Sequence, residues 1–293
     1  MRIIDARKIS YAFSGILVLA SFLAVWVWGL KLGIDFTGGT LMEVEYNLPA
    51  GGSRPAINLP EVIIQPVGER GLILRMPAIS EQEHQAILTE LRKLGELEEK
   101  QFTSIGPTIG QELKRNSLYA IILVMLMIAL YIAWAFREVS RPISSWKYGL
   151  AALVALVHDV SIPTGLFAVL GRFYGVTADT LFVTALLTIL GFSVHDTIVV
   201  FDRIRENLKK SGAREEFENI VETSLRQTIG RSINTSLTVM IVMLALYFLG
   251  GASTKFFALA ILVGVFFGTY SSIFIASFLL VTWNKWALKH VSF

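Results

Sequence analysis

Six apolar stretches, each long enough to cross a lipid bilayer, constrain this chain more than any other feature. They cover residues 11–30, 117–136, 149–170, 180–201, 232–251 and 256–283, and a membrane-spanning helix needs about 20 such residues. Charged residues make up only 17% of the chain, whereas soluble domains carry about 25%. The sequence therefore predicts an all-α membrane bundle of six transmembrane helices, and it argues against a soluble enzyme.

The distribution of basic residues predicts the orientation of this bundle. With a cytoplasmic N-terminus, the segments on that side hold more than half of the Lys and Arg residues, whereas the two short outer loops hold only Arg172 and Lys255. Cytoplasmic loops carry such an excess of positive charge. We therefore expect a multi-pass protein with both termini cytoplasmic. The basic loops accompany no nucleic-acid motif, so no nucleic-acid partner is expected.

The remaining long segment, residues 31–116, is large enough to be a small external domain inserted between the first and second helices. Residues 42–46 alternate apolar and acidic side chains, as a half-buried strand does. Ser80 and Glu83 match a capping box that opens a helix, and we expect His84 on that helix to be solvated. Further strand candidates are 62–67, 71–76 and 100–105, which together predict an α+β domain with an antiparallel sheet.

These assignments divide the chain into three parts. Residues 1–30 are the cytoplasmic N-terminus and the first transmembrane helix, which we read as a retained span because its apolar run exceeds the roughly 7–15 residues of a signal peptide. Residues 31–116 are the external domain. Residues 117–293 form a five-helix transmembrane region, with an amphipathic cytoplasmic segment at 202–230 that reads as a helix lying at the membrane interface.

Two of the spans carry a His–Asp pair at membrane depth. His158 and Asp159 lie in the third span, and His195 and Asp196 lie in the fourth. A charged group at the middle of a span costs roughly 2.5–3.5 kcal/mol, so it is commonly functional. The pattern predicts proton or ion coupling, while the alternative is that each aspartate only forms hydrogen bonds between helices.

The fourth span has a polar stripe beside Asp196. Thr184, Thr188, Gly191 and His195 recur at helical spacing and share one face, which is too polar for lipid. We expect this face to contact protein or a water-filled cavity. Ser193 and Thr197 add hydroxyl groups to the same span, as supporting polar residues.

Arg231, at the start of the fifth span, is the predicted partner of Asp196. The fourth span ends and the fifth begins on the cytoplasmic side, so the two residues lie at similar depths. Arginine stays charged at every relevant pH. Asn234 and Thr235 follow it and make the entry to this span unusually polar, which suits interhelical hydrogen bonds or a wet crevice.

Five sequence strings are similar to those of the SecF proteins within the SecD/SecF family of protein-export membrane proteins, which resembles the resistance-nodulation-division superfamily. The resemblance extends over nearly the whole chain, and the strings occur in the family's order relative to six spans. They are GIDFTGGT (33–40), IGPTIGQEL (105–113), GFSVHDTIVVFDRIREN (191–207), RQTIGRSINTSLT (226–238) and GTYSSIFIAS (268–277).

The resemblance implies a non-enzymatic subunit of the cell (inner) membrane that works with a SecD-like subunit beside the SecYEG channel. Protons, or sodium ions, would drive movements that help a translocating preprotein to leave the channel. Asp196 and Arg231 match the family's coupling residues, and Asp35, Gly38 and Gly39 match its external motif. The resemblance implies no cofactor and no metal. His195 stands where the family commonly has Asn, and residues 49–60 replace a helix that the family usually has.

Two other functions fit parts of the pattern. A proton- or sodium-coupled exporter of small molecules or lipids would keep the aspartate in the membrane but would need a substrate cavity. An intramembrane aspartyl protease could use Asp159 and Asp196 as a dyad. The GxGD string expected of such a protease is missing, so export remains the preferred interpretation.

Overall fold

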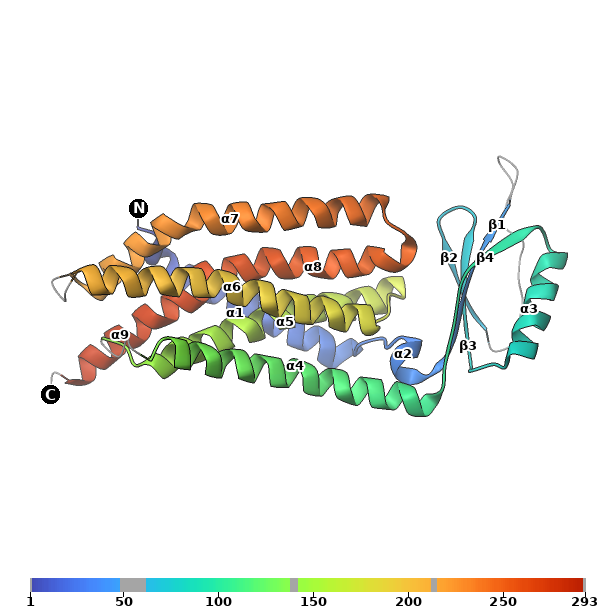
Figure 1. The fold of residues 1–293 in the computed structure, drawn as a ribbon, viewed down its shortest axis with the longest axis horizontal. Helices are drawn as coiled ribbons and strands as arrows, with labels where there is room; N and C mark the ends of the chain where they lie inside the picture. The colour runs from blue at the N-terminus through green and yellow to red at the C-terminus, as the bar shows by residue number, and fades with distance from the viewer. Residues whose placement is uncertain (1, 48–61, 138–141, 212–214, 292–293) are drawn as a thin grey trace. The chain divides into compact units, whose positions relative to one another are not determined.

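In the computed structural model, the chain divides into two compact units (Figure 1). A helical unit comprises Met1–Lys31 and Tyr119–Phe293, and a unit containing the sheet comprises Leu32–Leu118. The structure describes residues 2–47, 62–137, 142–211 and 215–291. Residues 49–60, where the sequence departs from the family's helix, lie outside these described residues.

Six helices in the described part of the chain are long and apolar enough to span a membrane, as the sequence predicts. A short 3-10 helix (Ile3–Ala6) precedes the first of them, and the last span is interrupted by a π-helical segment (Ser272–Ala276). The elements of these spans are α1 (Arg7–Trp28), α4 (Pro107–Ala135), α5 (Ser145–Tyr174), α6 (Thr180–Ser211), α7 (Phe217–Leu249), and α8 (Ala252–Ser271) followed by α9 (Ser277–Val291).

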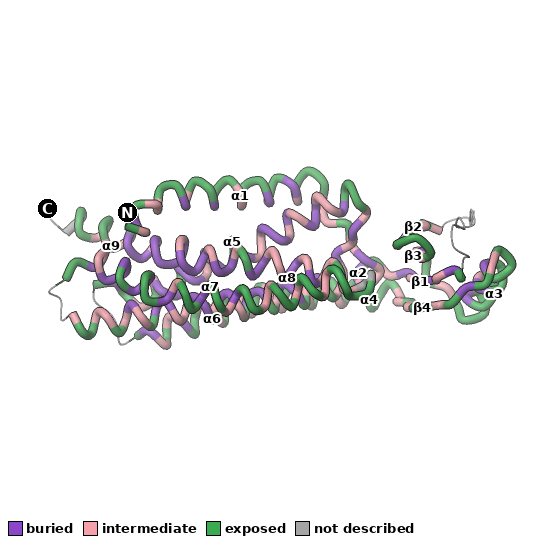
Figure 2. The backbone as a smooth tube through the Cα atoms, turned by 90° about the horizontal axis from the view of Figure 1, so that it is seen from above, coloured by how far each residue is buried: buried purple, intermediate pink, exposed green. Residues whose placement is uncertain are grey.

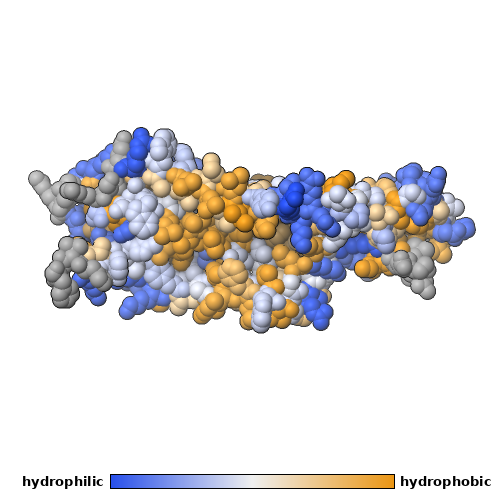
Figure 3. Space-filling view, turned by 90° about the horizontal axis from the view of Figure 1, so that it is seen from below, coloured by the Kyte–Doolittle hydropathy of each residue, from blue (hydrophilic) through white to orange (hydrophobic). Residues whose placement is uncertain are grey.

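The helical unit exposes many large apolar side chains. On α1, Trp26 is 82% exposed, and α4 is similarly uncovered along most of its length. Figure 2 shows the exposed positions recurring along α1, and Figure 3 shows hydrophobic side chains gathered over the middle of the helical unit. Soluble monomers rarely expose such large apolar areas. These helix faces therefore suit lipid or the helices of another membrane protein.

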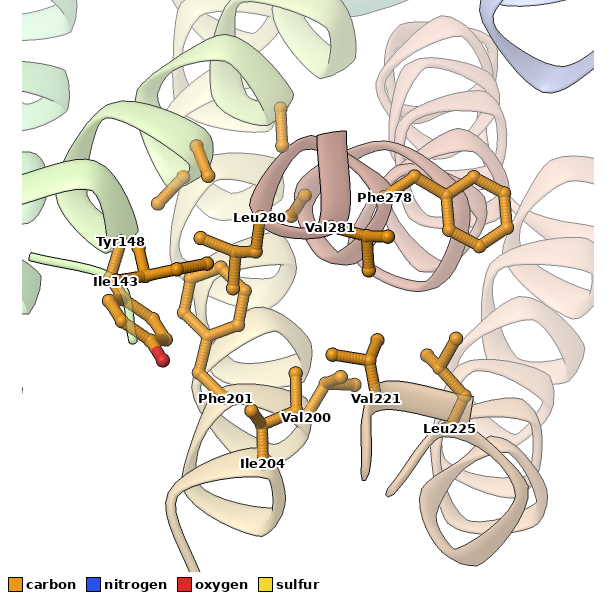
Figure 4. Close-up of a cluster of buried hydrophobic side chains, with 14 of the residues drawn as sticks. Ile143, Tyr148, Val200, Phe201, Ile204, Val221, Leu225, Phe278, Leu280 and Val281 are labelled. Atoms are coloured by element: carbon orange, nitrogen blue, oxygen red, sulfur yellow. The ribbon is translucent and has the colours of Figure 1, made fainter. Parts of the chain in front are cut away.

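An apolar cluster fills the end of the helical unit where both termini lie (Figures 1 and 4). Tyr148, Phe201 and Phe278 are fully buried there. The ring of Tyr148 stacks on that of Phe136 at 5.3 Å and meets that of Phe201 edge-on at 5.2 Å. Aromatic packing of this kind holds α4, α5 and α6 together at this end.

The segment 202–230 does not form a helix of its own, contrary to our reading of its periodicity. Helix α6 continues to Ser211, and α7 begins at Phe217. Phe217, Val221 and Leu225 bury their side chains in the cluster of Figure 4. The apolar face is therefore satisfied by packing on the bundle, and the described residues of this segment continue α6 and α7.

The first turn of the chain is tied to α7 by a carboxylate. The side chain of Glu222 accepts hydrogen bonds from the backbone N–H groups of Ile3 and Ile4, each at 3.1 Å. Arg226 Nε donates to the same carboxylate at 2.7 Å. An acidic group is favourable at a helix start, where backbone N–H groups lack partners. These bonds fix the beginning of the first span to the N-terminal turns of α7.

Small residues allow close approach between helices. A Cβ atom added to Gly165 of α5 would lie 2.5 Å from Cα of Ser21 in α1. One added to Gly264 of α8 would lie 2.1 Å from Cδ1 of Ile189 in α6. Ala260, Gly264 and Gly268 recur every four residues along α8, and these small residues form a packing surface against α6.

The second unit contains a four-stranded antiparallel sheet with the strand order β2-β3-β1-β4. Its core lies between the sheet and α3, where Val44, Leu74, Leu88 and Leu91 are buried. This arrangement confirms the predicted antiparallel α+β character. The elements are α2 (Ile34–Thr37), β1 (Gly39–Tyr46), β2 (Ile63–Val67), β3 (Gly71–Met76), α3 (Glu81–Lys93) and β4 (Leu97–Ile105).

The start of α3 shows one prediction confirmed and one wrong. The capping box of Ser80 and Glu83 is present. His84 is only 5% exposed, however, and not solvated. Its Nδ1 lies 3.1 Å from Oε1 of Glu81 and its Nε2 lies 2.8 Å from Oε1 of Glu99, while its ring stacks on Phe102. These two carboxylates allow the polar side chain of His84 to be buried, and helical periodicity alone does not show that they lie beside it.

The two glycines of the external motif permit close backbone packing. Gly38 has φ +74°, and a Cβ atom there would lie 2.8 Å from Cα of Pro107 at the start of α4. Gly39 has φ +126°, and its Cβ would lie 2.9 Å from the carbonyl oxygen of Met76. Residues other than glycine rarely adopt such φ values. Asp35 lies in the first turn of α2, directly before this turn.

Substitution of Gly264 tests the close contact between α8 and α6. We expect Gly264→Ala to destabilise the protein by about 1–3 kcal/mol, because the new methyl group overlaps Ile189. Gly191→Ala is the matched control, since no atom lies within 4 Å of its Cβ position and alanine favours the helix. Thermal unfolding in detergent should show a lower Tm for Gly264→Ala only; an unchanged Tm would contradict this packing.

The capping box should make α3 sensitive to acid. Hydrogen bonds from the backbone N–H and hydroxyl of Ser80 lower the pKa of Glu83 below its ordinary value of about 4.3. Their stabilisation is present above the ordinary pKa and is lost as the pH falls through the lowered one. Between about pH 5 and pH 3, amide exchange in α3, corrected for intrinsic rates, should accelerate more in the native protein than in Glu83→Gln. Equal acceleration would refute this role.

Candidate functional site

Asp159 is completely buried in the middle of α5, with 0% exposure. Its Oδ2 accepts hydrogen bonds from Ser193 of α6 at 2.5 Å and from Ser271 of α8 at 2.8 Å. Its Oδ1 lies 2.8 Å from Nδ1 of His158. Three side chains thus satisfy this carboxyl group, whereas Nε2 of His158 is buried and has no hydrogen-bond partner among the described residues.

Asp196, 2% exposed, occupies a second buried position on α6. Its Oδ2 accepts a hydrogen bond from Thr269 of α8 at 3.1 Å, and the hydroxyl of Ser236 on α7 lies 3.5 Å away. Ser236 and Thr269 also hydrogen-bond to each other. Helices α6, α7 and α8 therefore meet at Asp196 through hydroxyl groups, which can either donate or accept.

One turn of α8 serves both aspartates. Thr269 reaches Asp196, while Ser271 reaches Asp159. Gly268 makes this possible, because a Cβ atom there would lie 3.2 Å from Cβ of Ser193 and 3.6 Å from Oδ2 of Asp159. The next residue along, Ser272, opens the π-helical segment. Such local widening of a helix is frequent at functional sites.

The supporting polar residues fall into two groups. Ser193 and Thr197 are buried and bond to neighbouring helices, with Thr197 Oγ1 2.8 Å from Oγ of Ser272. Thr188 and Thr235 instead donate to carbonyl groups of their own helices, four residues back. Asn234 lies on the exposed face of α7. Of these residues, only Ser193 bonds directly to an aspartate.

The expected ion pair between Asp196 and Arg231 is not formed. Among the ion pairs of the described residues none joins these two side chains, and Arg231 is exposed on α7. The reason is helical geometry, because Ser232 and Ser236 occupy the face of α7 that is turned toward Asp196. Arg231 precedes that face by one position, or about 100° around the helix.

The polar stripe of α6 lies on one exposed face, as its spacing predicts. Thr184, Thr188, Gly191 and His195 are all exposed in this chain. His195 therefore points away from the buried side of α6, although it adjoins Asp196 in sequence. Because exposed polar groups suit neither lipid nor an apolar helix, a protein or aqueous surface is expected to cover them.

Sequence reasoning missed the contribution of α8. Thr269 and Ser271 are both hydrogen-bond donors to the aspartates, but no role was predicted for either of them. The available signal was the run of hydroxyl-bearing residues at 269–272 within an otherwise apolar span. Within the described residues, no cluster of three or more His, Asp or Glu side chains could hold a metal ion.

Comparison with protein families gives two matches. The model described as "Protein export membrane protein SecD/SecF, C-terminal" matches residues 85–286, and the "SecD/SecF GG Motif" matches residues 28–47. Protein translocase subunit SecF of Thermobaculum terrenum is 46% identical over 96% of this chain and 94% of its own length. The subunit of the same name from Anaerolinea thermophila is 37% identical over 97% of this chain and 94% of its own.

Solved structures show the same relationship. The crystal structure of SecDF, a translocon-associated membrane protein from Thermus thermophilus, matches with a TM-score of 0.82 at 33% identity. The match covers 97% of this chain and 39% of that chain, so this chain spans well under half of it. A SecDF structure in the super-membrane-facing form matches with a TM-score of 0.72 at 32% identity, covering 100% of this chain and 40% of that one.

Substitutions at Asp159 should distinguish the loss of its hydrogen bonds from the loss of its charge. Asp159→Ala leaves the hydroxyl group of Ser193 without its acceptor, at a cost of about 1–3 kcal/mol for that buried group, whereas Ser271 can still donate to the carbonyl oxygen of Gly268 at 3.0 Å. Asp159→Asn keeps one oxygen for both hydroxyls and offers its amide to His158. We expect Tm in detergent to fall clearly for Asp159→Ala and slightly for Asp159→Asn; the reverse order would show that the charge itself stabilises the fold.

Proposed function

Because this chain belongs to the SecD/SecF family of protein-export membrane proteins, with a SecF-like role, we propose that it couples the proton-motive force to late steps of preprotein export. It is a multi-pass membrane protein. The role of a translocase subunit is non-enzymatic, so the buried aspartates are better explained by ion coupling than by a protease dyad. The family match likewise favours protein export over export of small molecules or lipids.

A single observation carries this proposal: Asp196 is buried at membrane depth among hydroxyl groups rather than against a cation. A fixed cation would hold the carboxylate ionised, whereas hydroxyls can serve both of its protonation states. Asp196 can therefore take up a proton on one side of the membrane and release it on the other. Each charge moved through 100 mV supplies about 2.3 kcal/mol.

His195 and Arg231 complete this coupling site in the proposal. Both lie on exposed faces, on α6 and α7 respectively, which are the two helices joined by the buried contact between Asp196 and Ser236. His195 exchanges protons with the covering surface, and Arg231 compensates the charge of Asp196 in a conformation where α7 has rotated. Asp159, which is already fully hydrogen-bonded, has a secondary part in coupling.

A SecD-like subunit is the partner that covers the exposed polar stripe of α6. The SecD/SecF family and the SecDF structures support such a partner. The hydroxyl groups of Thr184 and Thr188 and the ring of His195 give that partner a polar surface at membrane depth. A polar interface between spans also admits water, which a route for protons requires.

The remaining proposals concern the surroundings of the chain. It lies in the cell membrane with both termini cytoplasmic, and the sheet unit is external, beside the SecYEG channel. Movements driven at Asp196 reach this unit and act on the emerging preprotein. In this unit the two motif glycines, Gly38 and Gly39, fit tightly against neighbouring backbone.

Preprotein translocation into inverted membrane vesicles tests the proposal. Vesicles should contain the chain, its SecD-like partner and the channel, and the rate is measured with and without a proton-motive force. We expect Asp196→Asn to lose most of the gradient-dependent increment, because Asn keeps the size of the side chain but cannot titrate.

Asp202→Asn is the matched control for this experiment. It makes the same change on the same helix, at an exposed position paired with Arg205. Surface ion pairs contribute little, so this variant should keep the increment. If Asp196→Asn retains the increment at equal protein levels, the coupling assignment is wrong.

A further inference from the structure

The hydroxyl group of Thr269 bonds to residues on two other helices rather than to a carbonyl of its own helix. Threonine hydroxyls in membrane helices commonly bond to a carbonyl of their own helix, as Thr184 and Thr188 do here, four residues back. Thr269 on α8 instead donates to Asp196 of α6 and contacts Ser236 of α7. It is buried, with 8% exposure. Thr269 therefore connects three helices at the proposed coupling group.

The contacts form a short chain with a defined end. From Asp196 it passes through Thr269 to Ser236, whose hydroxyl also lies 2.8 Å from the carbonyl oxygen of Ser232. Each hydroxyl has one hydrogen to donate and lone pairs to accept with. The carbonyl of Ser232 can only accept. The chain therefore has two complete arrangements of hydrogens, which run in opposite directions.

The two arrangements match the two states of Asp196. When Asp196 is ionised, Ser236 donates to Thr269 and Thr269 donates to the carboxylate. When Asp196 is protonated, its own O–H donates to Thr269, Thr269 donates to Ser236, and Ser236 donates to the carbonyl of Ser232. No buried hydrogen is left without an acceptor in either state, so neither state pays the cost of an unsatisfied polar group.

We infer that Thr269 is a positioning residue for proton coupling, the central member of a reversible hydroxyl chain that stabilises both protonation states of Asp196. This inference rests on the proposed function, because it presumes that Asp196 titrates. Within the described residues, the groups that α7 and α8 place against Asp196 are hydroxyls. On α6 itself, the titratable neighbour of Asp196 is His195. The reversal moves the hydrogens of Thr269 and Ser236 without moving either helix.

Infrared difference spectroscopy between acidic and alkaline pH tests the inference on the full chain with its SecD-like partner. The C=O band of protonated Asp196 is assigned by its absence in Asp196→Asn. In Thr269→Val, which keeps the side-chain shape but removes the hydroxyl, this band should move to higher wavenumber, because the acid has lost its nearer acceptor at 3.1 Å and keeps only Ser236 at 3.5 Å. Thr269→Ser should restore the native position. Thr238→Val, the same change on an exposed face of α7 where the hydroxyl bonds to its own helix, should not move the band.

Translocation in vesicles provides the second measurement. Thr269→Val should reduce the gradient-dependent increment about tenfold, the effect of losing one hydrogen bond to a charged group, while Thr269→Ser and Thr238→Val should retain it. If Thr269→Val does not fold, Ser236→Ala takes its place, since it removes the next member of the chain and should shift the same band.

The outcomes separate the inference from the proposed function. A native band position and native increment in Thr269→Val, together with loss of the increment in Asp196→Asn, would overturn the role of Thr269 alone. If Asp196→Asn keeps the increment or removes no titrating band, the proposed coupling group and the hydroxyl chain are both wrong.

Discussion

The rest of the helical unit depends on how two carboxyl groups are satisfied away from water. Lipid offers no hydrogen-bond partner, so the protein must supply every one. It does so mainly with serine and threonine hydroxyls, drawn from three helices and concentrated on one turn of α8. Because these bonds are short-range, α5, α6, α7 and α8 must approach closely at this level. Gly264 and Gly268 provide the necessary space on α8.

This arrangement treats the two aspartates differently. Asp159 is surrounded by donors on both oxygens, so its environment resembles that of a structural group. Asp196 has fewer partners, and those partners can reverse their roles. The same turn of α8 bonds to both, so the two carboxyl groups are connected through Thr269 and Ser271. A sequence that places a His–Asp pair in each of two spans does not by itself reveal this asymmetry.

Much of the fold could be predicted from the sequence because it depends on local patterns. The spans follow from apolar length, the strands from alternation, and the start of α3 from Ser80 and Glu83. The predicted pairing of Asp196 with Arg231 failed because depth in the membrane does not determine which face of α7 is turned inward. The burial of His84 and the role of Thr269 were not predicted, for a related reason: their partners, Glu99 and Asp196, are not neighbours in the sequence. Residues far apart along the chain meet only through the packing of whole elements.

Helix α7 joins the buried site to the beginning of the chain. It is one unbroken helix from Phe217 to Leu249, anchored at its first turns by the bonds of Glu222 to Ile3 and Ile4. Its C-terminal half packs on the bundle through Val239, Met240 and Met243, while Phe248 and Leu249 are exposed. A rigid helix that is anchored at its start and packed along one side tilts as a lever, with its fulcrum near the anchor. A small tilt beside Ser236 is then magnified at the far tip of α7, while the first span is held in step with it at the anchored end.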